Sequence, residues 1–203
     1  MPSRLSSNRL TLFLKAPHPG RVKTRLAADL GSEAACAAHV RLVETVLGNL
    51  STLDGVELRF TPDDSLAEIE RWLRPGWQAK PQGSGDLGEK LARAVRQTLA
   101  SGAHRVVVIG SDCPEVTSTD IEAAWTALTY HDVVLGPAAD GGYWLIGLRS
   151  GDTPVFEGIS WSTPRVLEQT LARCRVAHLK VMLLRELRDV DTLDDWKRFC
   201  ARD

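Results

Sequence analysis

Residues 10–26 read LTLFLKAPHPGRVKTRL, and this stretch decides the fold. The apolar run Leu10–Leu14 predicts a short buried strand, which opens into a loop rich in proline and glycine. Thr24 is expected to begin a helix directly after that loop. The loop carries four cationic side chains: Lys15, Arg21, Lys23 and Arg25. Fixed positive charge, free backbone N–H groups and a helix start behind a strand are typical of polyphosphate sites in open α/β sheets. A solvated basic loop is the alternative interpretation.

The composition fits a single globular domain over residues 1–203. The chain is 43% hydrophobic and 25% charged with a net charge of −1, so it has enough apolar surface for a core and no basic excess for nucleic acid. No apolar run approaches the roughly 20 residues that a membrane-spanning helix needs. Four scattered cysteines, without a Cys-x-x-Cys pair, argue against a zinc site or a disulfide framework. We therefore expect a cytoplasmic protein that does not bind nucleic acid and does not span a membrane.

Strands and helices alternate along the chain, which predicts the α/β class with a largely parallel sheet. The three consecutive valines in 105–109 mark the clearest buried strand. Thr163-Pro164 is typical of a helix start, and Ser32 is expected to cap an earlier helix. The other expected strands are 10–14, 56–60, 78–81, 132–135, 143–148 and 181–184, and the expected helices are 34–50, 66–73, 87–99, 118–128, 164–173 and 193–200.

Two acidic motifs follow predicted strands, GSDCP at 110–114 and DVDT at 189–192. A carboxylate at the carboxyl end of a strand can hold Mg²⁺ or Mn²⁺, which takes one or two protein oxygens and completes its shell with ligand phosphates. Asp112 and Asp191 are the candidate metal ligands. A capping or turn-forming role is the alternative for both. Cys113 has no histidine nearby in the sequence, so we interpret it as a small buried residue and not as a nucleophile.

The segment DGGYW at 140–144 is the candidate acceptor site. Its two glycines let the backbone approach a ligand closely, and Asp140 can contact an acceptor or act as a base. A plain hairpin explains Asp-Gly-Gly equally well. The loops at 83–89 and 158–163 are further candidates for substrate contacts.

Taken in order, six segments of the chain resemble one bacterial family: KAPHPGRVKTRL, GDLGE, GSDCP, DGGY, GISWST and DVDT. Its members are glycosyltransferase-A-like proteins of unknown function, sometimes called selenium-associated transferases. They belong to the nucleotide-diphospho-sugar transferase superfamily. The resemblance runs from about Leu10 to Asp195. It implies a single-domain, three-layer α/β/α sandwich with a mixed, mostly parallel sheet of seven strands and a nucleotide cleft at the carboxyl ends of the strands.

The resemblance also implies roles for individual residues. By position, Lys15, Arg21, Lys23 and Arg25 fall where such enzymes bind a triphosphate, Asp112 falls where they hold metal, and Asp191 resembles the second metal carboxylate. We add Pro19, Gly20, Gly85 and Ser111 to the nucleotide site, and Asp140, Gly141, Gly142, Tyr143 and Trp161 to the acceptor site. Related pyrophosphorylases carry a Gly-x-Gly-x-Arg loop where this chain has Pro-Gly, so base selectivity does not transfer.

Three functions follow as hypotheses. The first is a Mg²⁺- or Mn²⁺-dependent nucleotidyltransferase, which joins a nucleoside monophosphate to a small acceptor and releases pyrophosphate; Lys23, Arg25, Asp112 and Asp140 would be its catalytic residues. The second is a glycosyltransferase that uses a nucleotide sugar. The third is a nucleotide-binding protein without catalysis. The four-cation loop favours the first, because a triphosphate carries more charge than a nucleotide sugar. The oligomeric state, a homodimer included, is left open.

Overall fold

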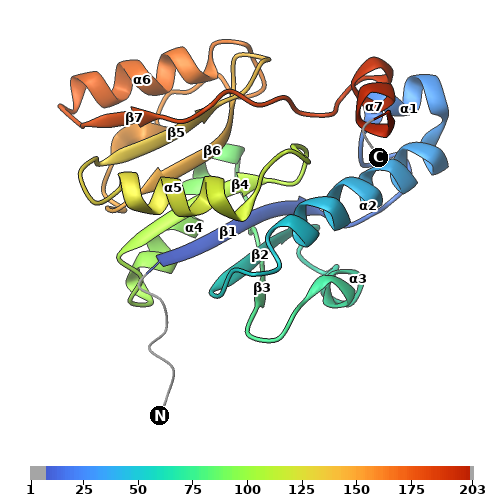
Figure 1. The fold of residues 1–203 in the computed structure, drawn as a ribbon, viewed down its shortest axis with the longest axis horizontal. Coiled ribbons are helices and arrows are strands. Elements are labelled where there is room, and N and C mark those ends of the chain that lie inside the picture. The colour runs from blue at the N-terminus through green and yellow to red at the C-terminus, as the bar shows by residue number, and fades with distance from the viewer. Residues whose placement is uncertain (1–7, 202–203) are drawn as a thin grey trace.

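A central sheet of seven strands organises the computed structural model, which describes residues 8–201 (Figure 1). The strand order is β3-β2-β1-β4-β6-β5-β7. Strand β6 runs antiparallel to its neighbours β4 and β5, and the other pairings are parallel. The strands are β1 Asn8–Lys15, β2 Val56–Thr61, β3 Gln78–Pro81, β4 Arg105–Gly110, β5 Val133–Pro137, β6 Tyr143–Leu148 and β7 Val181–Leu183. The mixed, mostly parallel sheet that the sequence predicted is confirmed.

Helices cover both faces of this sheet and complete the three layers (Figure 1). One apolar core lies between the sheet and the helices α2, α3 and α5, and a second lies between the opposite face and α4 and α6. Helices α1 and α7 pack together beside the sheet. The helices are α1 Thr24–Leu30, α2 Ser32–Asn49, α3 Leu66–Ile69, α4 Leu87–Ala100, α5 Ser118–Ala127, α6 Val166–Val176 and α7 Leu193–Cys200, with short 3-10 turns η1 Glu70–Trp72 and η2 Pro154–Phe156.

The two central strands, β1 and β4, place the candidate site. They pair in parallel, with Leu12 opposite Ile109 and Phe13 opposite Gly110. Along β1, Leu12 belongs to the first core while Phe13 packs against the second, because successive side chains of a strand point to opposite faces. Both strands end at the same edge of the sheet. The basic loop after β1 and the acidic motif after β4 therefore emerge side by side.

Three local expectations were wrong. Gly31 occupies the N-cap position of α2, and Ser32 is already its first helical residue. The segment 66–73 divides into α3 and η1. Helix α6 begins at Val166, because the Thr163 hydroxyl donates to Ser160 O at 2.7 Å and forms a turn before the helix. Between residues 8 and 201, no helix is long and apolar enough to cross a membrane.

Candidate functional site

Asp112 and Asp191 meet on one buried ammonium group. Asp112 follows β4, and Asp191 lies in the extended segment between β7 and α7, which is tied to Asp112 because Val190 N donates to Asp112 O at 2.9 Å. The Lys23 ammonium contacts Asp112 Oδ1 at 2.7 Å, Asp191 Oδ1 at 3.1 Å and Val190 O at 2.6 Å. Two segments that are distant in the sequence thus converge on the ammonium group of a third.

Lys23 is held in this position by its backbone as well as by charge. Its side chain is only 4% exposed, and its backbone has the left-handed conformation (φ 45°) at the N-cap of the seven-residue helix α1. Burial lowers the pKa of Lys23, but the charges and hydrogen bonds of Asp112 and Asp191 outweigh it and raise the pKa above its usual value. The ammonium therefore stays charged. In this structure the Lys23 ammonium is bound to the carboxylates of Asp112 and Asp191, and its expected contact with a phosphate stays a prediction.

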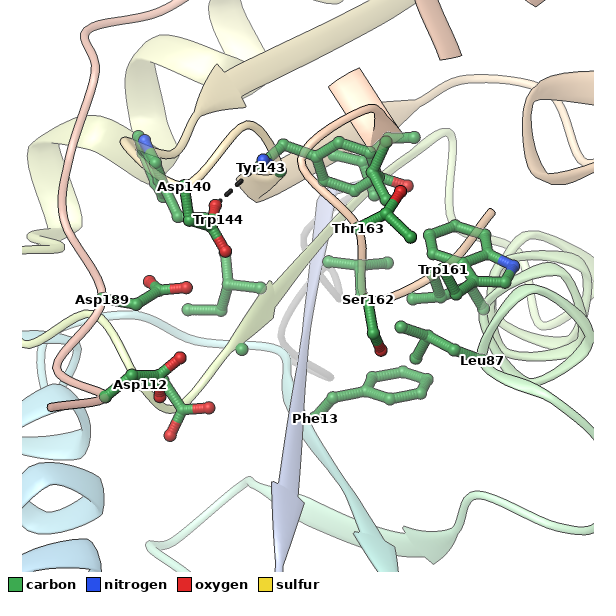
Figure 2. A pocket seen from close by; sticks show the side chains of 18 of the residues that line it. Phe13, Leu87, Asp112, Asp140, Tyr143, Trp144, Trp161, Ser162, Thr163 and Asp189 are labelled. Atoms are coloured by element: carbon green, nitrogen blue, oxygen red, sulfur yellow. Dashed lines mark hydrogen bonds between the residues drawn. The ribbon is translucent and has the colours of Figure 1, made fainter. Parts of the chain in front are cut away.

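Asp189 is the site residue that the sequence interpretation did not select. Burial raises its pKa to about 7, and the negative charges of Asp112, Asp191 and Asp140 add to this shift. Figure 2 shows Asp189 between Asp112 and Asp140. The motif did hold a signal, because residues two apart in an extended segment project to the same side. Both aspartates of Asp-Val-Asp accordingly line the same cavity.

Two cavities open at this edge of the sheet, and they share Phe13, Arg25, Gly110, Asp112 and Asp191. The larger one has a volume of about 450 Å³ and lies over β4 and β6. It has an acidic side and an apolar side: Asp112, Asp140 and Asp189 lie along one wall, and Phe13, Leu87 and Trp161 lie opposite (Figure 2).

The smaller cavity, of about 320 Å³, lies over β1 and β2 and is lined by more cationic side chains than the larger one. Lys15, Lys23, Arg25 and Ser111 line it. His39 lines it as well, and its Nε2 lies 2.9 Å from Lys15 O, so this ring nitrogen is the donor. Burial lowers the pKa of His39, which keeps the ring neutral. Lys15 and Lys23 thus line only the smaller cavity, Asp140 and Asp189 line only the larger one, and Asp112 and Asp191 line both.

The structure brings together most of the residues predicted for the site. Asp140, Gly142, Tyr143 and Trp161 line the larger cavity, and the predicted metal ligands line both. Five predicted residues line neither cavity: Pro19, Gly20, Arg21, Gly85 and Gly141. Gly141 packs against the cavity-lining residue Pro164: a Cβ on Gly141 would lie 2.1 Å from Pro164 O, and its φ of 88° suits glycine.

Two residues of the acceptor segment have partners in the turn and the core. Asp140 Oδ1 accepts a 2.9 Å hydrogen bond from Gly142 N, which is the hairpin role left open above. Tyr143 packs edge-on against Trp161 with ring centroids 6.5 Å apart, and burial raises the pKa of its hydroxyl. The ring of Tyr143, and not its hydroxyl, is therefore the part expected to contact a ligand in the cavity.

Burial also raises the pKa of Cys113 to about 12, so this buried thiol is no nucleophile.

The carboxylates fit a hard divalent cation. Asp112 and Asp191 direct one oxygen each to the same point, which now holds the ammonium of Lys23. Within the part of the chain that the structure describes, no three His, Cys, Asp or Glu side chains form a complete metal cage. Two carboxylates suit Mg²⁺, which keeps several waters and binds substrate phosphates rather than a full set of protein ligands.

Comparison with known proteins gives the family. The model of a family described as "Uncharacterized protein conserved in bacteria (DUF2064)" matches residues 48–163. The chain belongs to this family. Among solved structures, a protein of Desulfovibrio desulfuricans G20, described provisionally as a nucleotide-diphospho-sugar transferase, is 34% identical with a TM-score of 0.88, over 96% of this chain and 86% of that one. No curated protein matches the chain significantly.

More distant structures share the fold of this DUF2064 protein. The 4-diphosphocytidyl-2C-methyl-D-erythritol synthase of Anaerococcus prevotii is 10% identical with a TM-score of 0.63, over 97% of this chain and 99% of that one. A CMP:2-keto-3-deoxy-manno-octonic acid synthetase solved with CTP is 11% identical with a TM-score of 0.62, over 97% and 98%. These likenesses confirm the nucleotide-diphospho-sugar transferase fold that the sequence motifs indicated.

Proposed function

We propose that this protein is a divalent-metal-dependent nucleotidyltransferase, which transfers a nucleoside monophosphate from a nucleoside triphosphate to a small acceptor and releases pyrophosphate. One observation carries the proposal: a cation-lined cavity and a larger, partly apolar cavity share Asp112 and Asp191. A reaction between two substrates needs both within reach of the same charge-stabilising groups. The fold shared with the CTP-bound synthetase supports the assignment.

The smaller cavity is assigned to the nucleotide. Lys15 and Arg25 supply positive charge for the phosphates there, and the Arg25 side chain is 73% exposed and accessible to ligand. Asp112 and Asp191 would hold Mg²⁺ or Mn²⁺, which neutralises charge on the α-phosphate when bound. The Pro-Gly loop and Gly85 line neither cavity, so their contacts with nucleotide remain proposals.

The larger cavity is assigned to the acceptor. An acceptor oxygen attacks the α-phosphorus, the bond from that phosphorus to the bridging oxygen breaks, and pyrophosphate leaves. Asp140 lines this cavity and uses only Oδ1 in its turn, which makes it the candidate for receiving the acceptor proton. Arg25 is the only cationic side chain that lines the cavity among residues 8–201. A neutral acceptor body with an apolar face is therefore favoured over one carrying extra phosphates.

A second candidate function is glycosyl transfer from a nucleotide sugar. The name of the 34% identical Desulfovibrio structure favours it. The same two cavities can hold the diphosphate and the sugar, and Asp140 would then act as the base for the acceptor hydroxyl. The difference between the two functions lies in the bond that breaks: a phosphorus–oxygen bond releases pyrophosphate, and a sugar–oxygen bond releases a nucleoside diphosphate.

The experiment that tests the proposal uses this difference. The protein is incubated with each nucleoside triphosphate, Mg²⁺ and a pool of small hydroxyl and phosphate compounds, and pyrophosphate is measured. In parallel, thermal shifts are recorded for triphosphates and nucleotide sugars with and without metal. Metal-dependent stabilisation by a triphosphate together with pyrophosphate release supports nucleotidyl transfer. Stabilisation by nucleotide sugars alone supports glycosyl transfer, and no shift by any nucleotide contradicts both.

A further inference from the structure

We propose that Lys23 occupies the cation position between Asp112 and Asp191 in the nucleotide-free protein and leaves it when metal and nucleotide bind together. The inference rests on the proposed function, because it takes these two carboxylates as the metal ligands. It adds a regulation of that site: the free protein holds divalent metal weakly, and the triphosphate supplies the anionic partner that draws Lys23 away.

The first support is the bonding of the ammonium group. An ammonium has three N–H donors, and Lys23 has three oxygens within 3.1 Å: Asp112 Oδ1, Asp191 Oδ1 and Val190 O. Its donors are thus fully used at the point where the carboxylates converge. A metal ion bound by the same two oxygens competes with the ammonium for this space, since both cations need the same lone pairs.

The second support is the position of Lys23 at the smaller cavity. Its backbone is fixed, because Lys23 O accepts the first hydrogen bond of α1 from Ala27 N at 2.8 Å. Its side chain is long and flexible, and it lines the smaller cavity beside Lys15 and Ser111. Rotation of the side chain alone can therefore carry the ammonium from the carboxylates to the place assigned to the phosphates. The same movement opens the metal position and adds a cation to the phosphate site.

The consequence is a coupling between metal and nucleotide. In the free protein, a metal ion must break the contacts of Lys23 without replacing them. With a triphosphate present, the phosphate oxygens become the new partners of the ammonium. Metal and triphosphate should each strengthen the binding of the other, by a factor within the range of about 5 to 150 that is usual for coupled sites.

The test measures Mn²⁺ binding to the full chain at one fixed pH, by titration with detection of free Mn²⁺ by electron paramagnetic resonance. Wild type, Lys23→Ala and Lys23→Met are compared without nucleotide, and both variants should bind Mn²⁺ about tenfold or more tightly than wild type. Arg25→Ala is the matched control, since Arg25 also pairs with Asp191, at 3.7 Å, but is exposed and outside the point of convergence. It should change the affinity less than threefold.

A second arm adds a non-hydrolysable nucleoside triphosphate. This compound should raise the Mn²⁺ affinity of wild type by a larger factor than that of Lys23→Met, because the variant has no ammonium to displace. Unchanged or weaker Mn²⁺ binding in both Lys23 variants without nucleotide overturns the inference. If Lys23→Ala fails to fold in EDTA, Lys23→Met keeps most of the side-chain volume and gives the answer.

One further variant separates this inference from the proposed function. Asp112→Asn should abolish most Mn²⁺ binding with and without nucleotide. If Asp112→Asn binds Mn²⁺ as wild type does, the metal site itself is wrong, and the proposed function falls with it. If Asp112→Asn loses Mn²⁺ while the Lys23 variants bind it as wild type does, the metal site stands and only the displacement of Lys23 is refuted.

Discussion

The two walls of the larger cavity are built in different ways (Figure 2). The acidic wall combines short segments that follow β4, β5 and β7, and its aspartates gather although their charges repel. The apolar wall is closely packed. The ring centroid of Trp161 lies 6.5 Å from those of Phe156 and Tyr143, and a Cβ added to Gly88 would lie 2.7 Å from the indole nitrogen of Trp161. Electrostatics positions one wall, and close packing positions the other.

This contrast predicts different responses to mutation. Burial first, and then the neighbouring carboxylate charges, raise the pKa of Asp189, so neutralising one carboxylate of the acidic wall should leave the fold intact and change the chemistry. The apolar wall contributes buried surface, so truncating a side chain there should change the shape of the cavity and the stability of the protein together.

The largest effect is expected for Asp112→Asn. The change keeps the size of the side chain and removes the charge that would hold the metal, so the rate of product formation should fall by a factor of about 10²–10³. The melting temperature should fall only moderately, because the amide oxygen can still accept from the Lys23 ammonium and Asp191 stays as its counter-charge. The matched control is Asp194→Asn, an exposed acid in the first turn of α7 that lines neither cavity. Equal rates for the two variants would contradict the role of Asp112.

A smaller effect is expected on the apolar wall, for Trp161→Ala compared with Trp161→Phe. Loss of the indole should raise the KM for the acceptor about tenfold, while the affinity for nucleotide stays unchanged, because Trp161 lines only the larger cavity. The phenylalanine variant should retain most of the acceptor affinity. Steady-state kinetics with varied acceptor and nucleotide measure both quantities. A loss of nucleotide affinity in Trp161→Ala would show that the two cavities are assigned wrongly.

The fold and the acidic wall differ in how much of them the sequence predicted. Apolar runs, alternating patterns and turn residues together indicated the seven strands, and the clearest signal was the unbroken apolar run of the buried strand β4. The positions of Asp112 and Asp191 after strands were sufficient to place both carboxylates at one edge of the sheet. The contacts of Lys23 could not be predicted, since they depend on how a loop and a segment 168 residues apart meet in space.

The errors also have physical causes. Thr163-Pro164 has the local pattern of a helix start, but the loop in which it lies packs against Gly141, and the Thr163 hydroxyl bonds Ser160 O. Tertiary contact overrode the local preference there. The acidic residues of the Asp189 segment are equally explained by a preference for a helix N-terminus, so the sequence alone does not single out Asp189. Its partial burial, which gives it a raised pKa, is a property of the assembled cavity.

The acidic wall also predicts a pH effect on the metal-free protein. The pKa of Asp189 is about 7 in the folded protein, and an unfolded chain has the ordinary value near 4. Between these values the folded state holds a proton that the unfolded state releases, so this group lowers the free energy of unfolding as pH rises from about 4 to about 7. Urea unfolding in EDTA at several pH values should show this decline in wild type and in Asp194→Asn. Asp189→Asn should lack that part of it, and an identical decline in Asp189→Asn would contradict the shift.

The smallest effect is expected on the free energy of unfolding, from the left-handed backbone conformation that places Lys23 at the acidic wall. Lys23→Gly and Lys23→Ala both lose the ion pairs, so their difference isolates the left-handed conformation at φ 45°. Glycine adopts it without strain, and Lys23→Gly should be more stable than Lys23→Ala by up to about 1 kcal/mol. At Arg25, inside helix α1, the order should reverse, with glycine less stable than alanine by about 0.5–1 kcal/mol. Urea unfolding in EDTA measures both differences. If alanine is more stable than glycine at both positions, residue 23 does not keep the left-handed conformation once its ion pairs are lost. The ion pairs of Lys23 would then be what imposes its backbone conformation, and charge would position the backbone of this part of the site as well as its side chains.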